Sequence, residues 1–188
     1  MFLFFGGYEE RYINYFVPYG IYLAILLLGV IVFSRGKKKQ DIRKPKYEVV
    51  YYIVAFIPVV ATFFVAFLPT LPQMTGKLFL ITAVYALING TLEELFWRFT
   101  FHQVFEEKML FAYVIPTVIF TSWHIALTFA NGMSYHGGAL ALVGGAGVMG
   151  TIWGLVMYRT RNIKVLIAAH VCTNFCAFSQ LIAQNFFA

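Results

Sequence analysis

The stretch "GIYLAILLLGVIVFSRGKKKQ" (Gly20–Gln40) joins a long apolar run to a cluster of positive charges. A helix needs roughly 20 apolar residues to cross the hydrocarbon of a bilayer, and the run that ends at Phe33 is of that length. The basic residues that follow are typical of a loop beside anionic headgroups on the cytoplasmic side. The stretch therefore predicts a membrane-spanning helix and the side of the bilayer on which it ends.

The whole chain has the composition of a membrane protein. Of its 188 residues 61% are hydrophobic and only 12% are charged, whereas a soluble domain keeps about a quarter of its residues charged. The net charge of +6 does not indicate nucleic acid, because the basic residues are concentrated in "RGKKKQDIRKPK" (35–46). We expect the lipid bilayer as a partner, and no nucleic acid.

Five further stretches are long and apolar enough to span a membrane. We expect an all-α fold, a polytopic bundle of about six transmembrane helices in a single membrane domain (1–188), whose last four helices form the core that carries the chemistry. The expected spans are 12–33, 47–68, 78–101, 109–130, 138–158 and 163–187. Small residues recur every four positions in the fifth span, at Ala146, Gly150 and Gly154, and such a stripe predicts close helix packing.

The orientation follows from the Lys and Arg residues of the short loops. The loops after the first and fifth spans are basic, and those after the second and fourth are nearly free of Lys and Arg. Basic loops stay in the cytoplasm. We therefore expect a multi-pass protein of the cell membrane with both termini outside and its buried polar groups nearer the cytoplasmic face.

Charged residues stand where water should be absent, in "TLEELFWRFTFHQ" (91–103) of the third span. Glu94 and Arg98 are separated by four positions with the acid first, which is the favourable order for an ion pair on a helix. Glu93 points about 100° away from Glu94, so Arg98 cannot neutralise both acids equally. The spacing predicts a structural Glu94–Arg98 pair and leaves Glu93 for another purpose.

Three more polar residues lie within spans. His124 is in the fourth span, and His170 and Asn174 share one face of the sixth. A single buried histidine is often a hydrogen-bonded core residue. Four polar groups on three spans are costly to bury and indicate a functional site.

These residues form three motifs that resemble those of the CPBP (CAAX protease and bacteriocin-processing) family of intramembrane proteases, related to Rce1. "EELFWR" (93–98) is similar to that family's EExxxR, "FTSWH" (120–124) to its FxxxH and "HVCTN" (170–174) to its HxxxN. The motifs occur in the family's order, and the resemblance covers about 78–187. Phe99 stands where family members often have Gly, and the chain is short, which leaves the substrate open.

The resemblance implies a glutamate-type intramembrane endopeptidase, a CAAX-protease-like peptidase that acts on a membrane-associated or lipidated protein or peptide. It needs no cofactor. A water activated by one glutamate with the help of a histidine attacks the peptide bond, and a His/Asn pair stabilises the oxyanion. The catalytic residues are Glu93, His124, His170 and Asn174, and the supporting residues are Glu94 and Arg98.

Other functions fit the same residues. Glu93, His124 and His170 are an acceptable ligand set for Zn²⁺ with an open position for water, although no HExxH pair is present. A non-enzymatic membrane binding, immunity or transport protein is a second alternative. A prenylated tail, a leader peptide and a membrane-sorting helix all remain candidate substrates.

Overall fold

The computed structural model describes residues 8–34, 47–105, 108–130 and 132–187. The basic segment 35–46, on which the predicted cytoplasmic loop rests, lies outside the described residues. Every regular element of the described ranges is a helix, and six helices are long and apolar enough to cross a membrane. The expectation of an all-α, six-span membrane fold is therefore confirmed.

The first three spans differ in regularity. The first is the single helix α1 (Tyr8–Ser34), whereas the second and third change their helical winding along the way. The second span consists of α2 (Glu48–Ala55), α3 (Ile57–Thr62), the π-helix η1 (Phe63–Phe67), α4 (Leu68–Thr70) and the 3₁₀-helix η2 (Leu71–Gln73). The third consists of α5 (Gly76–Glu94), the π-helix η3 (Leu95–Thr100) and α6 (Phe101–Phe105).

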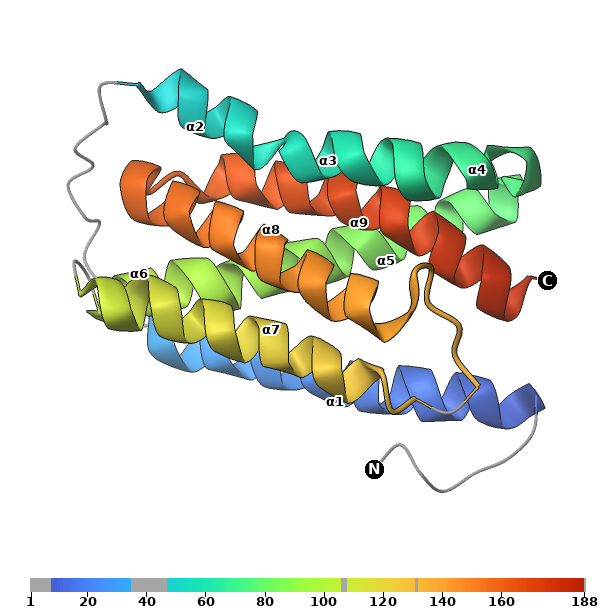
Figure 1. Cartoon of the computed structure of the whole chain (residues 1–188). Helices are drawn as coiled ribbons and strands as arrows, with labels where there is room; N and C mark the ends of the chain where they lie inside the picture. The colour runs from blue at the N-terminus through green and yellow to red at the C-terminus, as the bar shows by residue number, and fades with distance from the viewer. Residues whose placement is uncertain (1–7, 35–46, 106–107, 131, 188) are drawn as a thin grey trace.

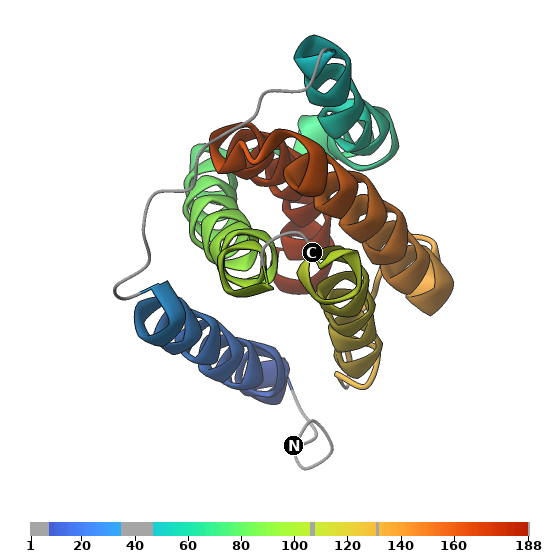
Figure 2. The same ribbon diagram turned by 90° about the vertical axis from the view of Figure 1, so that its left-hand side faces the viewer.

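The last three spans are formed by the π-helix η4 (Leu110–Val114) with α7 (Ile115–Leu127), by α8 (Gly138–Thr160) and by α9 (Ile163–Phe186). The spans alternate in direction, so that α1 begins and α9 ends at the same end of the bundle (Figure 1). Seen from one end, α1 and the second span lie at opposite edges (Figure 2). The most extensive contacts join α5 to α9 and α7 to α8.

The backbones of α5 and α9 touch at Gly90. A Cβ atom at this position would lie 3.0 Å from the backbone nitrogen of Val171 and 3.1 Å from its Cα. Glycine removes that obstacle and lets two helices approach closely in a membrane. Because Glu93 follows three residues later and His170 precedes Val171, this approach brings their side chains together.

The small-residue stripe of α8 packs against α7, as expected from its spacing. Ala146 is fully buried. A Cβ atom at Gly150 would lie 3.1 Å from the ring of Phe120, and one at Gly154 would lie 2.6 Å from the ring of Tyr113. The glycines of α8 therefore make room for Phe120, which lies beside the charged residues of the third span.

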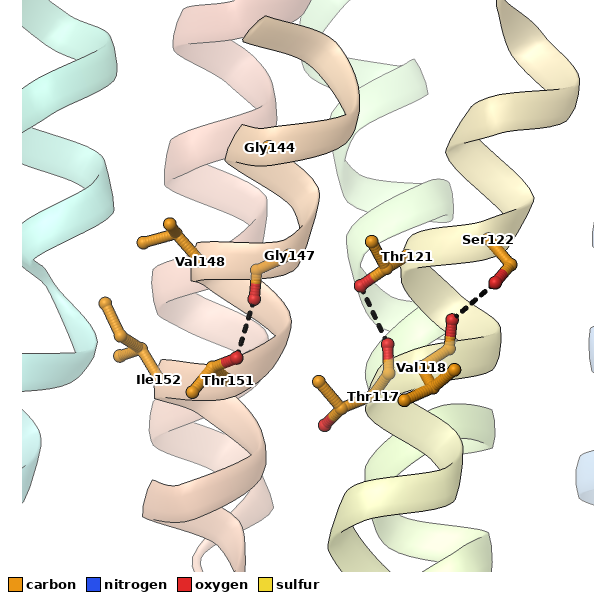
Figure 3. Close-up of a pocket in the computed structure, with 9 residues that line it drawn as sticks. All are labelled: Thr117, Val118, Thr121, Ser122, Gly144, Gly147, Val148, Thr151 and Ile152. Atoms are coloured by element: carbon orange, nitrogen blue, oxygen red, sulfur yellow. Dashed lines mark hydrogen bonds between the residues drawn. The ribbon is translucent and has the colours of Figure 1, made fainter. Parts of the chain in front are cut away.

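A groove of about 610 Å³ runs along the outside of the same helix pair (Figure 3). The hydroxyl groups of Thr121, Ser122 and Thr151 each donate a 2.8 Å hydrogen bond to a carbonyl one turn earlier in their own helix. These hydroxyls are satisfied locally, so the groove offers a packing surface and no free catalytic group.

Candidate active site

The two adjacent acids end α5 and are both buried, with 2% of Glu93 and none of Glu94 exposed. Arg98 Nη1 lies 3.4 Å from Glu94 Oε1, which confirms the pair predicted from the spacing. The guanidinium carbon also lies 4.2 Å from the centre of the Phe120 ring, in the position of a cation–π contact. The same carbon lies 5.9 Å from the centre of the Trp153 ring, so Arg98 is held by one carboxylate and two aromatic rings.

The helix widens immediately after the acids. Residues Leu95–Thr100 form the π-helix η3, and the Thr100 hydroxyl donates to the Leu95 carbonyl at 2.8 Å. Single π-turns inside membrane or soluble helices are frequent at functional sites. Here the wide turn separates the acids from the rest of the span and contains Arg98.

His170 lies between the two carboxylates. Its Nδ1 is 2.8 Å from Glu94 Oε1 and its Nε2 is 3.3 Å from Glu93 Oε2, and its ring lies 4.2 Å from that of Trp153, centre to centre. The sequence predicted that Glu94 pairs with Arg98 and did not predict this second partner. Glu94 therefore orients the imidazole and leaves Nε2 directed at Glu93.

The charges of the cluster balance when the imidazole is protonated, because Arg98 and His170 then face two carboxylates. Buried charges are tolerated only when they are paired and hydrogen-bonded. Glu94 Oε2 and both terminal nitrogens of Arg98 have no hydrogen-bond partner within the described part of the chain. Ordered water commonly satisfies buried polar atoms of this kind, so the cluster has the donors and acceptors to bind water.

Tyr22 was not predicted as a site residue. Its hydroxyl donates to Glu93 Oε1 at 2.8 Å and accepts a 2.9 Å hydrogen bond from Trp97 Nε1. The residue belongs to α1, whereas the sequence placed the core in the last four spans. A signal was present, because the buried tyrosines Tyr15, Tyr19 and Tyr22 recur at helical spacing along α1.

His124 lies on α7 and is half-buried. Its Nδ1 is 2.9 Å from the Phe120 carbonyl oxygen. A carbonyl only accepts, so Nδ1 carries a proton, and when the ring is neutral its Nε2 is an acceptor. The centre of the Phe120 ring lies 4.8 Å from that of the His124 ring and 6.2 Å from that of the His170 ring, which brings the two histidines into one region.

Asn174 has a partner that the sequence did not reveal. Its Nδ2 donates to Asn89 Oδ1 at 2.5 Å. Asn89 lies one turn before Glu93 on α5 and is 1% exposed. Its own Nδ2 is buried without a hydrogen-bond partner in the described residues. The two amides together hold N–H groups one helical turn away from Glu93 and His170.

The three motifs thus meet in the interior of the bundle, on α5, α7 and α9. The model of the Rce1-like family, described as type II CAAX prenyl endopeptidase Rce1-like, matches residues 75–176. This range covers more than half of the chain and contains all three motifs. The chain belongs to the Rce1-like family. A comparison with curated proteins and with solved structures finds no significant match.

Membership of this family implies a protease, and the six apolar helices imply one that crosses the membrane several times. The motif residues on α5, α7 and α9 all lie within the matched range. Tyr22 lies outside it, on a helix that the family comparison does not cover.

Glu93, His124 and His170 are the candidate ligands for a zinc ion. Within the described ranges, no group of three His, Cys, Asp or Glu side chains is arranged to hold one. Both ring nitrogens of His170 face carboxylates, and Nδ1 of His124 faces a carbonyl. Of the three alternative zinc ligands, His170 therefore has no ring nitrogen turned away from a carboxylate, and Glu93 already contacts Tyr22 and His170.

Proposed function

We propose that the chain is an intramembrane endopeptidase in which Glu93 activates a water for attack on a peptide bond. The substrate is a membrane-associated or lipidated protein or peptide. The observation that carries the proposal is the position of His170 between the carboxylates of Glu93 and Glu94. This position brings Glu93 of the first motif and His170 of the third together as a base and a proton donor. They meet inside a membrane protein of a protease family.

Glu93 acts as the general base, with His124 as its helper. The carboxylate takes one proton from water while the water oxygen forms a bond to the scissile carbonyl carbon. The other O–H of that water donates a hydrogen bond to His124 Nε2, since Nδ1 is bound to the Phe120 carbonyl. A base positioned in this way contributes about 10²–10⁴-fold to the rate.

His170 and Asn174 stabilise the negative charge that develops on the carbonyl oxygen. Glu94 anchors Nδ1 of His170. Nε2–H, which faces Glu93 Oε2 at 3.3 Å without substrate, turns to the substrate carbonyl oxygen and donates to the oxyanion, which leaves Oε2 to the attacking water. Asn174 contributes the amide hydrogen that it does not give to Asn89. Donors fixed before the reaction stabilise the tetrahedral intermediate without reorganisation. When the intermediate collapses, the C–N bond breaks and the proton held by Glu93 passes to the leaving amine nitrogen.

Glu94 and Arg98 are supporting residues in this proposal, because they orient His170 and balance the charge. The reaction requires no metal and no other cofactor. The proposal also includes a location in the cell membrane, with both termini outside and the site nearer the cytoplasmic face. The turn between α8 and α9, with Arg159 and Arg161, lies at the same end of the bundle as the end of α1 (Figure 1), which supports that orientation.

The experiment uses the full chain in lipid vesicles with two fluorogenic peptides, one farnesylated with a CAAX-type end and the other of the same sequence without the lipid. Glu93→Gln keeps the shape of the side chain and removes the base. Glu48→Gln, at the start of α2, is the matched control. We expect the wild type and Glu48→Gln to cleave at least one peptide and Glu93→Gln to cleave neither. Equal cleavage by Glu93→Gln would exclude the proposed base.

A further inference from the structure

The first helix supplies a hydrogen-bond donor to the site, although this helix lies outside the range that matches the family. α1 packs against α5 and η3, and only 7% of Tyr22 is exposed. The polar atom of Tyr22 contacts a motif residue directly, through the 2.8 Å hydrogen bond to Glu93 Oε1. A buried phenol hydroxyl needs such a partner.

The directions of the hydrogen bonds at Tyr22 are fixed by chemistry. The indole Nε1 of Trp97 can only donate, so the Tyr22 oxygen accepts from it at 2.9 Å. The phenol has a single proton, and the remaining partner within 2.8 Å is Glu93 Oε1. Glu93 Oε1 therefore accepts the hydrogen bond from the Tyr22 hydroxyl and is not itself the protonated oxygen.

The ring of Tyr22 is held as firmly as its hydroxyl. It stacks on the ring of Trp123 with 3.9 Å between centroids and 9° between planes. The Tyr19 ring packs against it in a T-shaped arrangement, with 5.8 Å between centroids. Trp123 directly precedes His124 on α7. The phenol is thus fixed between the third and fourth spans and cannot turn away from Glu93 without breaking this stack.

We propose that Tyr22 is a positioning residue that reserves Oε2 of Glu93 for the proton taken from water. The inference rests on the proposed function of Glu93. In the attack step an O–H bond of water breaks and a new O–H bond forms on Oε2, the oxygen that faces His170 at 3.3 Å. Oε1 stays the acceptor of the Tyr22 hydrogen bond. The same proton then leaves Oε2 for the amine nitrogen as the C–N bond breaks.

The other charged or titratable groups around Glu93 do not duplicate this role. Glu94 and Arg98 follow it on its own span and pair with each other. On the neighbouring helices, His170 faces the opposite carboxylate oxygen, Nδ1 of His124 is bound to the Phe120 carbonyl, and Tyr19 packs its ring against that of Tyr22.

The test compares Tyr22→Phe with Tyr15→Phe in the vesicle assay. Tyr22→Phe removes the hydroxyl and keeps the ring on Trp123, and Tyr15→Phe removes a buried hydroxyl two turns away on the same face of α1. Loss of a hydrogen bond to a charged group is worth about 1.5–3 kcal/mol, or roughly 10- to 150-fold. We expect kcat of Tyr22→Phe to fall at least tenfold with KM unchanged, and the acid limb of its rate–pH profile to shift. Tyr15→Phe should match the wild type.

A second measurement does not depend on cleavage. The infrared carboxylate band of Glu93, isolated as the difference between the wild type and Glu93→Gln, reports the hydrogen bond at Oε1. It should shift in Tyr22→Phe and not in Tyr15→Phe. A shifted band in a chain that cleaves no peptide would leave the Tyr22 contact standing and refute the proposed function. An unshifted band, an unchanged kcat or a change confined to KM would each overturn the positioning role.

Discussion

His170 Nδ1 lies 2.8 Å from Glu94 Oε1, although the two residues are 76 positions apart in the chain and on different helices. The same Glu94 oxygen lies 3.4 Å from Arg98 Nη1. One carboxylate oxygen therefore joins the third span to the sixth and faces both the Arg98 guanidinium and the His170 imidazole. The fold and the site depend on each other at this atom.

Arg98→Ala should destabilise the bundle as well as lower activity. It leaves the buried Glu94 carboxylate without its guanidinium partner, and breaking a buried pair costs on the order of 3–5 kcal/mol. Thermal unfolding in detergent measures the loss. Adding Glu94→Gln should recover part of the stability, since the unpaired charge is then removed. An Arg98→Ala variant as stable as the wild type would show that the pair contributes nothing to folding.

Gly90→Val should separate α5 from α9. The new Cβ would meet the backbone of Val171 at 3.0 Å, and such overpacking costs about 1–3 kcal/mol. Because His170 adjoins the contact, cleavage should fall more than stability does. Gly144→Val is the control, since a Cβ atom there has nothing within 4 Å. Equal effects of the two substitutions would refute the role of the close approach.

His124→Ala should lower kcat by about 10²–10⁴-fold, the range for a group that assists proton transfer, with an unchanged unfolding temperature. Its Nδ1 contact is within its own helix, so the fold does not depend on it. His136→Ala, at an exposed histidine before α8, serves as the control in the same cleavage assay. A His124→Ala enzyme with the wild-type kcat would remove this residue from the mechanism.

Chelation tests the metal-free reaction. Cleavage should be unchanged after incubation with a strong zinc chelator followed by gel filtration, and the active protein should contain less than one zinc ion per ten chains. Loss of activity that zinc restores, together with one bound zinc per chain, would instead favour the set Glu93, His124 and His170 as ligands.

Much of the fold could be predicted from the sequence, because each span is a continuous apolar run whose length is set by the bilayer. The ends of the runs were harder. The second span stays helical to Gln73 through two prolines, each in the first turn of a new segment, where a missing N–H costs nothing. The third stays helical to Phe105 through a π-turn.

The site was predictable only where its partners lie on one helix. The Glu94–Arg98 pair follows from a spacing of four, and its distance of 3.4 Å agrees. The other contacts of the site could not be predicted, because they depend on which faces of distant helices meet. These are the contacts of Glu94 with His170, of Glu93 with Tyr22 and of Asn174 with Asn89. The pairing of helix faces is decided by close contacts such as the one at Gly90, and the periodicity within one span does not predict such contacts.

The most direct measurement is the ratio of the initial cleavage rates of Glu93→Gln and Glu94→Gln in vesicles. Gln at position 94 still offers His170 Nδ1 an acceptor oxygen, so that variant should keep a reduced but measurable rate. Gln at position 93 cannot take a proton from water, and its rate should be at least 100-fold lower. A Glu93→Gln enzyme that cleaves as fast as Glu94→Gln, or faster, would contradict the assignment of Glu93 as the base.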